Sequence, residues 1–152
     1  MCRRANQGPL LEESRNVFLI TGALMSALAA ALHVGCIVFG APWYRFFGAG
    51  ERMAQMASAG HWYPAVVTVA IASILTGWSL YALSGASVIR PLPLLRPVLC
   101  AITAIYLLRG LVIVPLAVLG RTTPFWWWSS AICLLIGAVH LAGLLQVWPR
   151  LP

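Results

Sequence analysis

The sequence contains no lysine and no aspartate, and its only acidic residues are Glu12, Glu13 and Glu51. All ten basic residues are arginines, so the net charge of +7 reflects scarce acid as much as plentiful base. Catalysis by paired carboxylates is disfavoured, because Glu51 is the only acid outside the N-terminal tail. Nucleic-acid binding is also disfavoured, because the arginines are scattered and form no basic run.

Cysteine is also sparse, and three of the four cysteines lie inside apolar stretches, namely Cys36, Cys100 and Cys133. The sequence has no C-x-x-C pair and no cysteine–histidine spacing typical of metal sites. It therefore predicts neither a disulfide framework nor a zinc site, and we expect no metal and no cofactor.

Charged residues make up only 9% of the 152 residues and hydrophobic residues 61%, with a mean hydropathy of +0.89. A soluble domain is typically about 25% charged, so this composition indicates an integral membrane protein. Four apolar stretches are long enough to cross a hydrocarbon core of about 30 Å. We predict an all-α bundle of four transmembrane helices in one membrane domain, residues 1–152, with spans at about 17–41, 65–83, 94–119 and 129–148.

The first apolar stretch also resembles a cleavable signal peptide, with arginines before it and Ala27-Leu28-Ala29 as a possible cleavage site. Its apolarity continues past that site to Ala41, as an uncleaved membrane anchor requires. We therefore predict a transmembrane span.

The segment at about 42–60 is the longest connection between predicted spans, and it is rich in aromatic side chains. Aromatic residues favour the membrane interface, and residues 51–58 have the pattern of a short helix. We expect this segment to lie at the membrane surface. The aromatic cluster at 125–128 predicts another interfacial belt, just before the fourth span.

Small and weakly polar residues form rows that predict contacts between helices. Helical spacing gives two rows in the first span and one polar stripe in the second. The rows are Gly22-Ser26-Ala30 and Ala27-Ala31-Gly35, and the stripe is Thr68-Ala72-Thr76-Ser79. Pro115 predicts a kink in the third span.

Arginine counts on the two sides of the predicted bundle give an orientation. One side carries Arg3, Arg4, Arg15, Arg90, Arg96 and Arg150, and the other carries Arg45, Arg52 and Arg121. The positive-inside rule then places both termini in the cytoplasm. Small size and this topology suggest a bacterial-type inner membrane.

Arg109 lies inside the third apolar stretch, where a charge costs about 3 kcal/mol to insert and therefore needs a partner. At 1.5 Å per residue, it lies about 22 Å from the start of its span, and His33 about 24 Å from the start of the first. The two residues share a depth in the outer half, which the 42–60 segment and the start of the second span can also reach. We predict a polar outer-half cleft with these ligand-binding residues: Arg109, His33, Tyr106, Glu51 and His61.

This cleft predicts a protein that binds an anionic or polar amphiphile, such as a lipid or a quinone, with Arg109 as the anchor. Membrane lipids would then be its partners. A structural alternative pairs Arg109 with Glu51 or with backbone carbonyls, and nothing then binds in the cleft. A separate hypothesis is an accessory subunit whose small-residue rows and aromatic faces dock on a larger membrane complex, and other membrane subunits or a second copy of the chain would then be its partners. A third hypothesis is a redox protein with haem between His33 and His140, although these ligands would differ by about 12 Å in depth.

One motif set resembles a known family. Phe39-Gly40-Ala41-Pro42, then Gly48, then Ala59-Gly60 with Pro64 before the second span resemble the DoxX-like group of small four-helix bacterial membrane proteins. The resemblance covers about the first half of the chain. The sequence lacks the acidic residue expected in the second span and the arginine expected in the first. The resemblance implies a four-helix bundle and carries over no site residue.

Overall fold

The computed structural model describes residues 15–151, and within that range the chain is helical and contains no strand. Four helical segments are long and apolar enough to cross a membrane: Val17–Phe39, Trp62–Gly85, Leu95–Val118 and Pro124–Arg150. The predicted all-α, four-helix membrane bundle is therefore confirmed, and the protein is a multi-pass membrane protein. Residues 1–14 of the predicted cytoplasmic tail lie outside the described residues.

The described range contains seven α-helices and one 3-10 turn, of which five α-helices and the turn form the four spans. The first span is α1 (Val17–Phe39), and a surface segment with α2 (Ala41–Phe46) and α3 (Glu51–Ser58) leads to α4 (Trp62–Gly85). The third span is α5 (Leu95–Leu111) with α6 (Ile113–Val118), and the fourth is α7 (Pro124–Val147) with η1 (Trp148–Arg150). The predicted short helix at 51–58 is confirmed.

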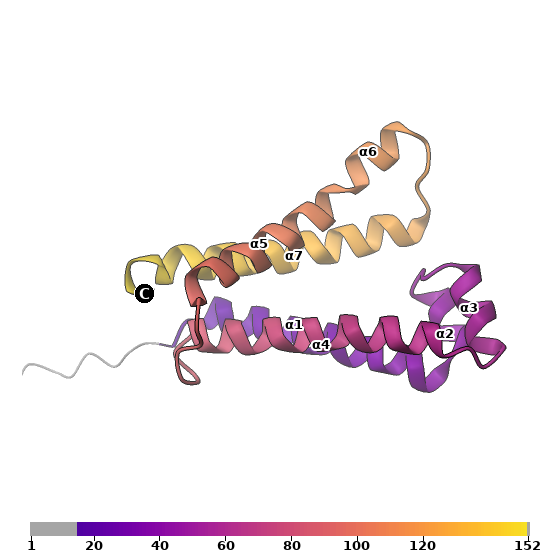
Figure 1. Cartoon of the computed structure of the whole chain (residues 1–152). Helices are drawn as coiled ribbons and strands as arrows, with labels where there is room; N and C mark the ends of the chain where they lie inside the picture. The colour runs from indigo at the N-terminus through magenta and orange to yellow at the C-terminus, as the bar shows by residue number, and fades with distance from the viewer. Residues whose placement is uncertain (1–14, 152) are drawn as a thin grey trace, which may run out of the picture.

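The spans are arranged as two antiparallel pairs, α1 with α4 and α5 with α7, and the pairs meet through α1–α7 and α4–α5 contacts (Figure 1). Helix α1 begins and α7 ends at the same end of the bundle, which we call the basic end. It carries Arg15, Arg90, Arg96 and Arg150. The opposite end, which we call the α3 end, carries α2, α3 and α6 (Figure 1).

Helix α1 turns one of its two predicted rows toward the interior. Gly22, Ser26 and Ala30 are buried, which confirms the first row. The second row is wrong for Ala27 and Ala31, which are exposed, whereas its last member, Gly35, lies against the Trp43 ring of α2. Five residues correspond to about 140° around a helix axis, so the two rows cannot face the same neighbour.

The polar stripe of α4 is largely buried as predicted. Thr68, Ala72 and Ser79 are buried. Thr76 is the exception: it is exposed, and its hydroxyl donates to the Ala72 carbonyl one turn earlier at 2.8 Å. Ser and Thr in membrane helices commonly satisfy their hydroxyl groups in this way.

Glycines let α5 and α7 approach closely, in a reciprocal arrangement. A Cβ placed on Gly110 would lie 2.5 Å from Leu134 Cγ, and one on Gly137 would lie 2.8 Å from Leu107 Cδ2. Each helix therefore accepts a leucine of the other over a glycine. Since lipid is as apolar as leucine, such close packing holds membrane helices together.

The third span breaks between α5 and α6 at Val112. Pro115 lacks the N–H that would bond to the Leu111 carbonyl, and its ring clashes with that carbonyl in a straight helix. The predicted kink is therefore confirmed and located one turn before the proline. Beyond the break, α6 diverges from α7 (Figure 1).

The fourth span starts earlier than predicted, at Pro124 and not near Ser129. The tryptophans at 126–128 belong to the first turns of α7. Proline is well tolerated in a first turn, and the aromatic residues continue the helix without interruption.

Candidate functional site

Arg109 lies on α5 just before the helix break and is partly buried against the start of α7. Its Nη2 donates a hydrogen bond to Ser129 Oγ at 3.2 Å. Its Cζ lies 4.9 Å from the centre of the Trp126 ring, which is a cation–π contact. Its Nη1 is buried and has no hydrogen-bond partner among the described residues.

These contacts orient the guanidinium group without neutralising it. A serine hydroxyl and an indole ring carry no net charge, and Nη1 still has hydrogen atoms to donate. Ser130, the next residue along α7, is also buried, and its hydroxyl has no partner in the described part of the chain. The unpartnered Nη1 of Arg109 therefore suits an oxygen acceptor, and most of all an anionic one.

Glu51 does not neutralise Arg109. Both of its carboxylate oxygens accept hydrogen bonds from Arg45, at 2.9 Å each, and both side chains are exposed. The predicted Glu51–Arg109 pair is therefore wrong. Arg45 lies only six residues away in the same connecting segment, so this pairing closes a short loop.

The Arg45 hydrogen bond lowers the pKa of the Glu51 carboxyl group below its usual value. A lowered pKa means that any stability from this pair is present above about pH 4.3 and is lost as the pH falls through the folded-state pKa. Exposed ion pairs contribute little, because water screens them. We expect Glu51→Gln to leave the melting temperature in detergent at pH 7 unchanged within error. A marked loss of stability at pH 7 would show that the carboxylate has a buried partner.

Tyr106 belongs to a polar cluster in the bundle interior. Its hydroxyl is 2.9 Å from Ser26 Oγ, and its ring packs edge-on against Trp78 with centroids 5.0 Å apart. The ring of His140 lies 5.4 Å away on the other side. The four residues come from α1, α4, α5 and α7, so this cluster joins all four spans. Sequence analysis missed Ser26 and Trp78 as its members, because single residues of common type carry no signal.

His140 is fully buried. Its Nδ1 lies 2.9 Å from the carbonyl oxygen of Ile136. Because a carbonyl oxygen only accepts hydrogen bonds, Nδ1 carries the proton of the neutral ring and Nε2 is the unprotonated nitrogen. Nε2 has no partner among the described residues, and the ring lies flat against Gly22 of α1. This histidine therefore fills the contact between α1 and α7.

His33 and His61 lie apart from this cluster. His33 is half-buried, and its Nδ1 donates to the Ala29 carbonyl of its own helix at 2.8 Å. His61 is exposed and precedes α4. The described residues show no hydrogen bond or ion pair between Arg109 and either histidine.

The haem hypothesis needs His33 and His140 at one level, and the structure separates them. The His140 ring lies on Gly22, and His33 is eleven residues further along α1, which corresponds to about 16 Å. Two axial ligands of one haem must lie at nearly the same depth in the bundle. The hypothesis that His33 and His140 together ligate haem is therefore wrong.

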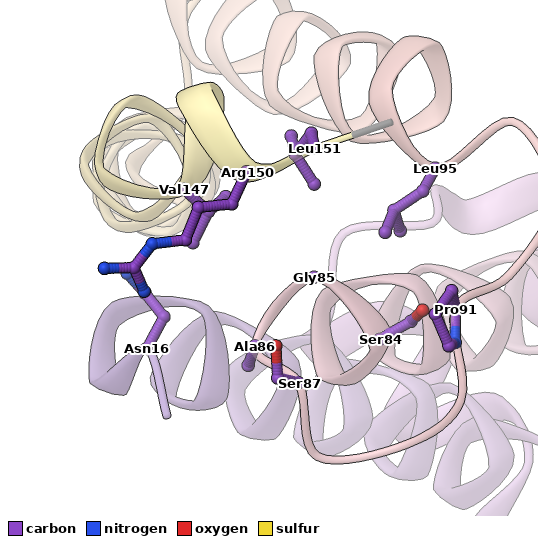
Figure 2. A pocket seen from close by; sticks show the side chains of 10 residues that line it. All are labelled: Asn16, Ser84, Gly85, Ala86, Ser87, Pro91, Leu95, Val147, Arg150 and Leu151. Carbon is purple, nitrogen blue, oxygen red and sulfur yellow. The ribbon is translucent and has the colours of Figure 1, made fainter. Parts of the chain in front are cut away.

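The described part of the chain has a hollow at each end of the bundle. One, of about 150 Å³, lies at the basic end and is lined by residues that include Asn16, Ser84 and Arg150 (Figure 2). The other, about 440 Å³ and open, lies at the α3 end beside Arg52 and Tyr63. Neither is lined by a residue of the predicted cleft, so ligand binding at Arg109 stays a prediction.

No family model matches the chain, and comparisons with curated proteins and with solved structures find no match. The four long apolar helices define the chain as a small four-helix integral membrane protein. The DoxX-like resemblance stays a prediction from sequence.

Proposed function

We propose that the protein binds an anionic amphiphile of the membrane and that Arg109 holds its acidic headgroup. The observation that supports this most is the buried Nη1 of Arg109, which has no partner in the described part of the chain. A guanidinium at membrane depth costs about 3 kcal/mol unless it is compensated, and no acidic side chain of the described residues compensates it. A ligand anion would supply the missing charge.

The kind of headgroup follows from the donors that remain. An arginine can hold a phosphate or carboxylate through two parallel hydrogen bonds, and Ser129 and Trp126 already fix the plane of its guanidinium. A quinone offers carbonyl acceptors but no charge, so it would leave the guanidinium unneutralised. An acidic lipid is therefore the favoured ligand class over a quinone.

The ligand test compares purified wild type with Arg109→Gln and Arg109→Lys by native mass spectrometry in mild detergent. We expect wild type to hold an acidic lipid that Arg109→Gln does not hold, with the affinity of that one site falling about tenfold or more, since a hydrogen bond to a charged group contributes about 1.5–3 kcal/mol. Arg109→Lys should retain part of the binding, because it keeps the charge but not the planar fork.

Arg121→Gln is the matched control, because it removes an exposed arginine at the same end of the bundle. Its lipid occupancy should equal that of wild type. Equal retention of the lipid by Arg109→Gln and wild type would refute the proposal. If a second protein co-purifies in place of lipid, the accessory-subunit alternative would be favoured.

We also propose that the basic end faces the cytoplasm of a bacterial-type cell, with the protein in the inner membrane. The support is the excess of arginines at that end. A cysteine placed at Ser87, between α4 and α5, should react with an impermeant thiol reagent only in opened cells, and one at Thr122 should react in intact cells. The reverse pattern would overturn this orientation.

A further inference from the structure

A small pocket opens at the basic end, where all four spans begin or end. The start of α1, the end of α4 with its following turn, the start of α5 and the end of α7 surround it (Figure 2). Leu95 and Leu151 lie on one side of the opening, and Gly85 and Ala86 on the other (Figure 2). Arg150 extends along the rim toward Asn16 (Figure 2). We infer that this pocket binds the phosphate of an anionic phospholipid through Arg150, independently of Arg109.

The charge around the pocket is of one sign in the described chain. Arg15, Arg90 and Arg96 lie at the same end as Arg150. Within residues 15–151 the only acidic residue is Glu51, which lies at the α3 end and is paired with Arg45. The arginines of the described residues therefore favour an anion at this end of the bundle, and a bordering leaflet would supply lipid phosphate.

The walls of the pocket are held by contacts inside the protein. Arg96 stacks on Trp148 at 4.5 Å, and its Nη2 donates to the Trp148 carbonyl at 3.1 Å, which fixes the turn that carries Arg150. Asn16 Nδ2 donates to Gln146 Oε1 at 2.8 Å and ties the start of α1 to the end of α7.

Arg150 is the charged residue among those that line the pocket. Ser84 Oγ donates to the Arg90 carbonyl and accepts from the Leu92 N–H, so this hydroxyl is already used. Both polar atoms of the Asn16 side chain are likewise engaged. The guanidinium of Arg150 is exposed and has no hydrogen-bond or ion-pair partner among the described residues.

The size of the pocket limits what can enter. Its volume of about 150 Å³ corresponds to roughly five waters at about 30 Å³ each. Pockets that enclose a drug-sized ligand have about 300–1,000 Å³, so a whole amphiphile is excluded. A phosphate with part of its glycerol fits, and the acyl chains would stay outside along the apolar faces of the spans.

The test measures the melting temperature of the full chain in neutral detergent with added short-chain phosphatidylglycerol, phosphatidylcholine or inorganic phosphate. We expect phosphatidylglycerol to stabilise wild type and phosphatidylcholine to do so much less, because its trimethylammonium group is bulky and is repelled by the arginines. In Arg150→Gln, the phosphatidylglycerol concentration for half-maximal stabilisation should rise about tenfold. Arg121→Gln removes the same charge at the α3 end and should behave as wild type.

Three results would overturn the inference. If Arg150→Gln and Arg121→Gln weaken the lipid effect equally, only net charge matters. If phosphatidylcholine stabilises as well as phosphatidylglycerol, the pocket does not select an anion. If inorganic phosphate alone reproduces the effect and the lipid adds nothing, the source is free phosphate. Arg109→Gln should leave unchanged the part of the phosphatidylglycerol stabilisation that depends on Arg150. This result would separate the Arg150 site from the site of the proposed function.

Discussion

Gly110→Ala is expected to force α5 and α7 apart and to destabilise the bundle by about 1–3 kcal/mol, the usual effect of overpacking a tight contact. The added Cβ would lie 2.5 Å from Leu134 Cγ and 2.9 Å from the Leu134 backbone nitrogen. A side chain can rotate away, but the backbone of a membrane helix cannot move alone, because its N–H is bonded along the helix. The interface therefore has to widen, and the reciprocal contact of Gly137 with Leu107 weakens with it.

Gly77→Ala is the matched control for this change. Gly77 is also inside a transmembrane helix, but a Cβ there would meet no atom within 4 Å. Thermal unfolding in detergent should show a clear loss for Gly110→Ala and none for Gly77→Ala, since alanine is the better helix former. Equal melting temperatures for the two variants would mean that the α5–α7 contact is looser than the structure shows.

The effects of Gly22→Ala and His140→Ala on the free energy of unfolding are expected to be strongly coupled. The Gly22 Cβ would lie 2.6 Å from Cε1 and 2.8 Å from Nδ1 of the His140 ring, so the alanine should destabilise by about 1–3 kcal/mol. His140→Ala removes a fully buried ring, and a cavity of that kind costs about 2–5 kcal/mol. In the double variant the clash is gone and the new methyl group fills part of the cavity.

The double variant should therefore be more stable than the sum of the two single effects predicts, by about 1 kcal/mol or more. This relief is possible because every close contact of Gly22 is with a side chain. The control cycle combines Gly77→Ala with His140→Ala and should be additive within about 0.5 kcal/mol. Additive behaviour of Gly22 and His140 would show that the ring does not rest on α1.

A further cycle, which combines Gly110→Ala with Leu134→Ala, distinguishes the two kinds of glycine contact when it is compared with the Gly22–His140 cycle. Leu134→Ala should only partly rescue Gly110→Ala, because the backbone nitrogen of residue 134 stays in place. His140→Ala should remove the whole steric effect of Gly22→Ala. The difference follows from whether the obstructing atom belongs to a side chain or to the main chain.

The number of spans, the short helix at 51–58 and the break before Pro115 were determined by the sequence alone. The physical reason is that each is a local property. A span needs an apolar run of about 20 residues, because the hydrocarbon core has a fixed thickness. Proline removes a backbone hydrogen bond from its own helix, and this effect does not depend on which other helices surround it.

Only the tertiary structure decided which faces meet. The row of Gly22 and the row of Ala27 have similar composition, and the first is buried while Ala27 and Ala31 of the second are exposed. In a soluble protein the exposed face of a helix would be polar. Lipid is as apolar as a protein interior, so the lipid-facing and the buried faces of a membrane helix have similar amino-acid compositions and cannot be told apart from the sequence.

The partners of the polar residues were likewise decided by tertiary structure. Glu51 was expected beside Arg109 and is held by Arg45, and Tyr106 was expected in a cleft and bonds to Ser26 in the interior. Depth along a helix can be counted from sequence at about 1.5 Å per residue. Rotation about the helix axis and the order of helices around the bundle depend on all four spans at once. These two quantities bring Arg109 to Ser129 and Trp126 and leave its Nη1 without a protein partner among the described residues.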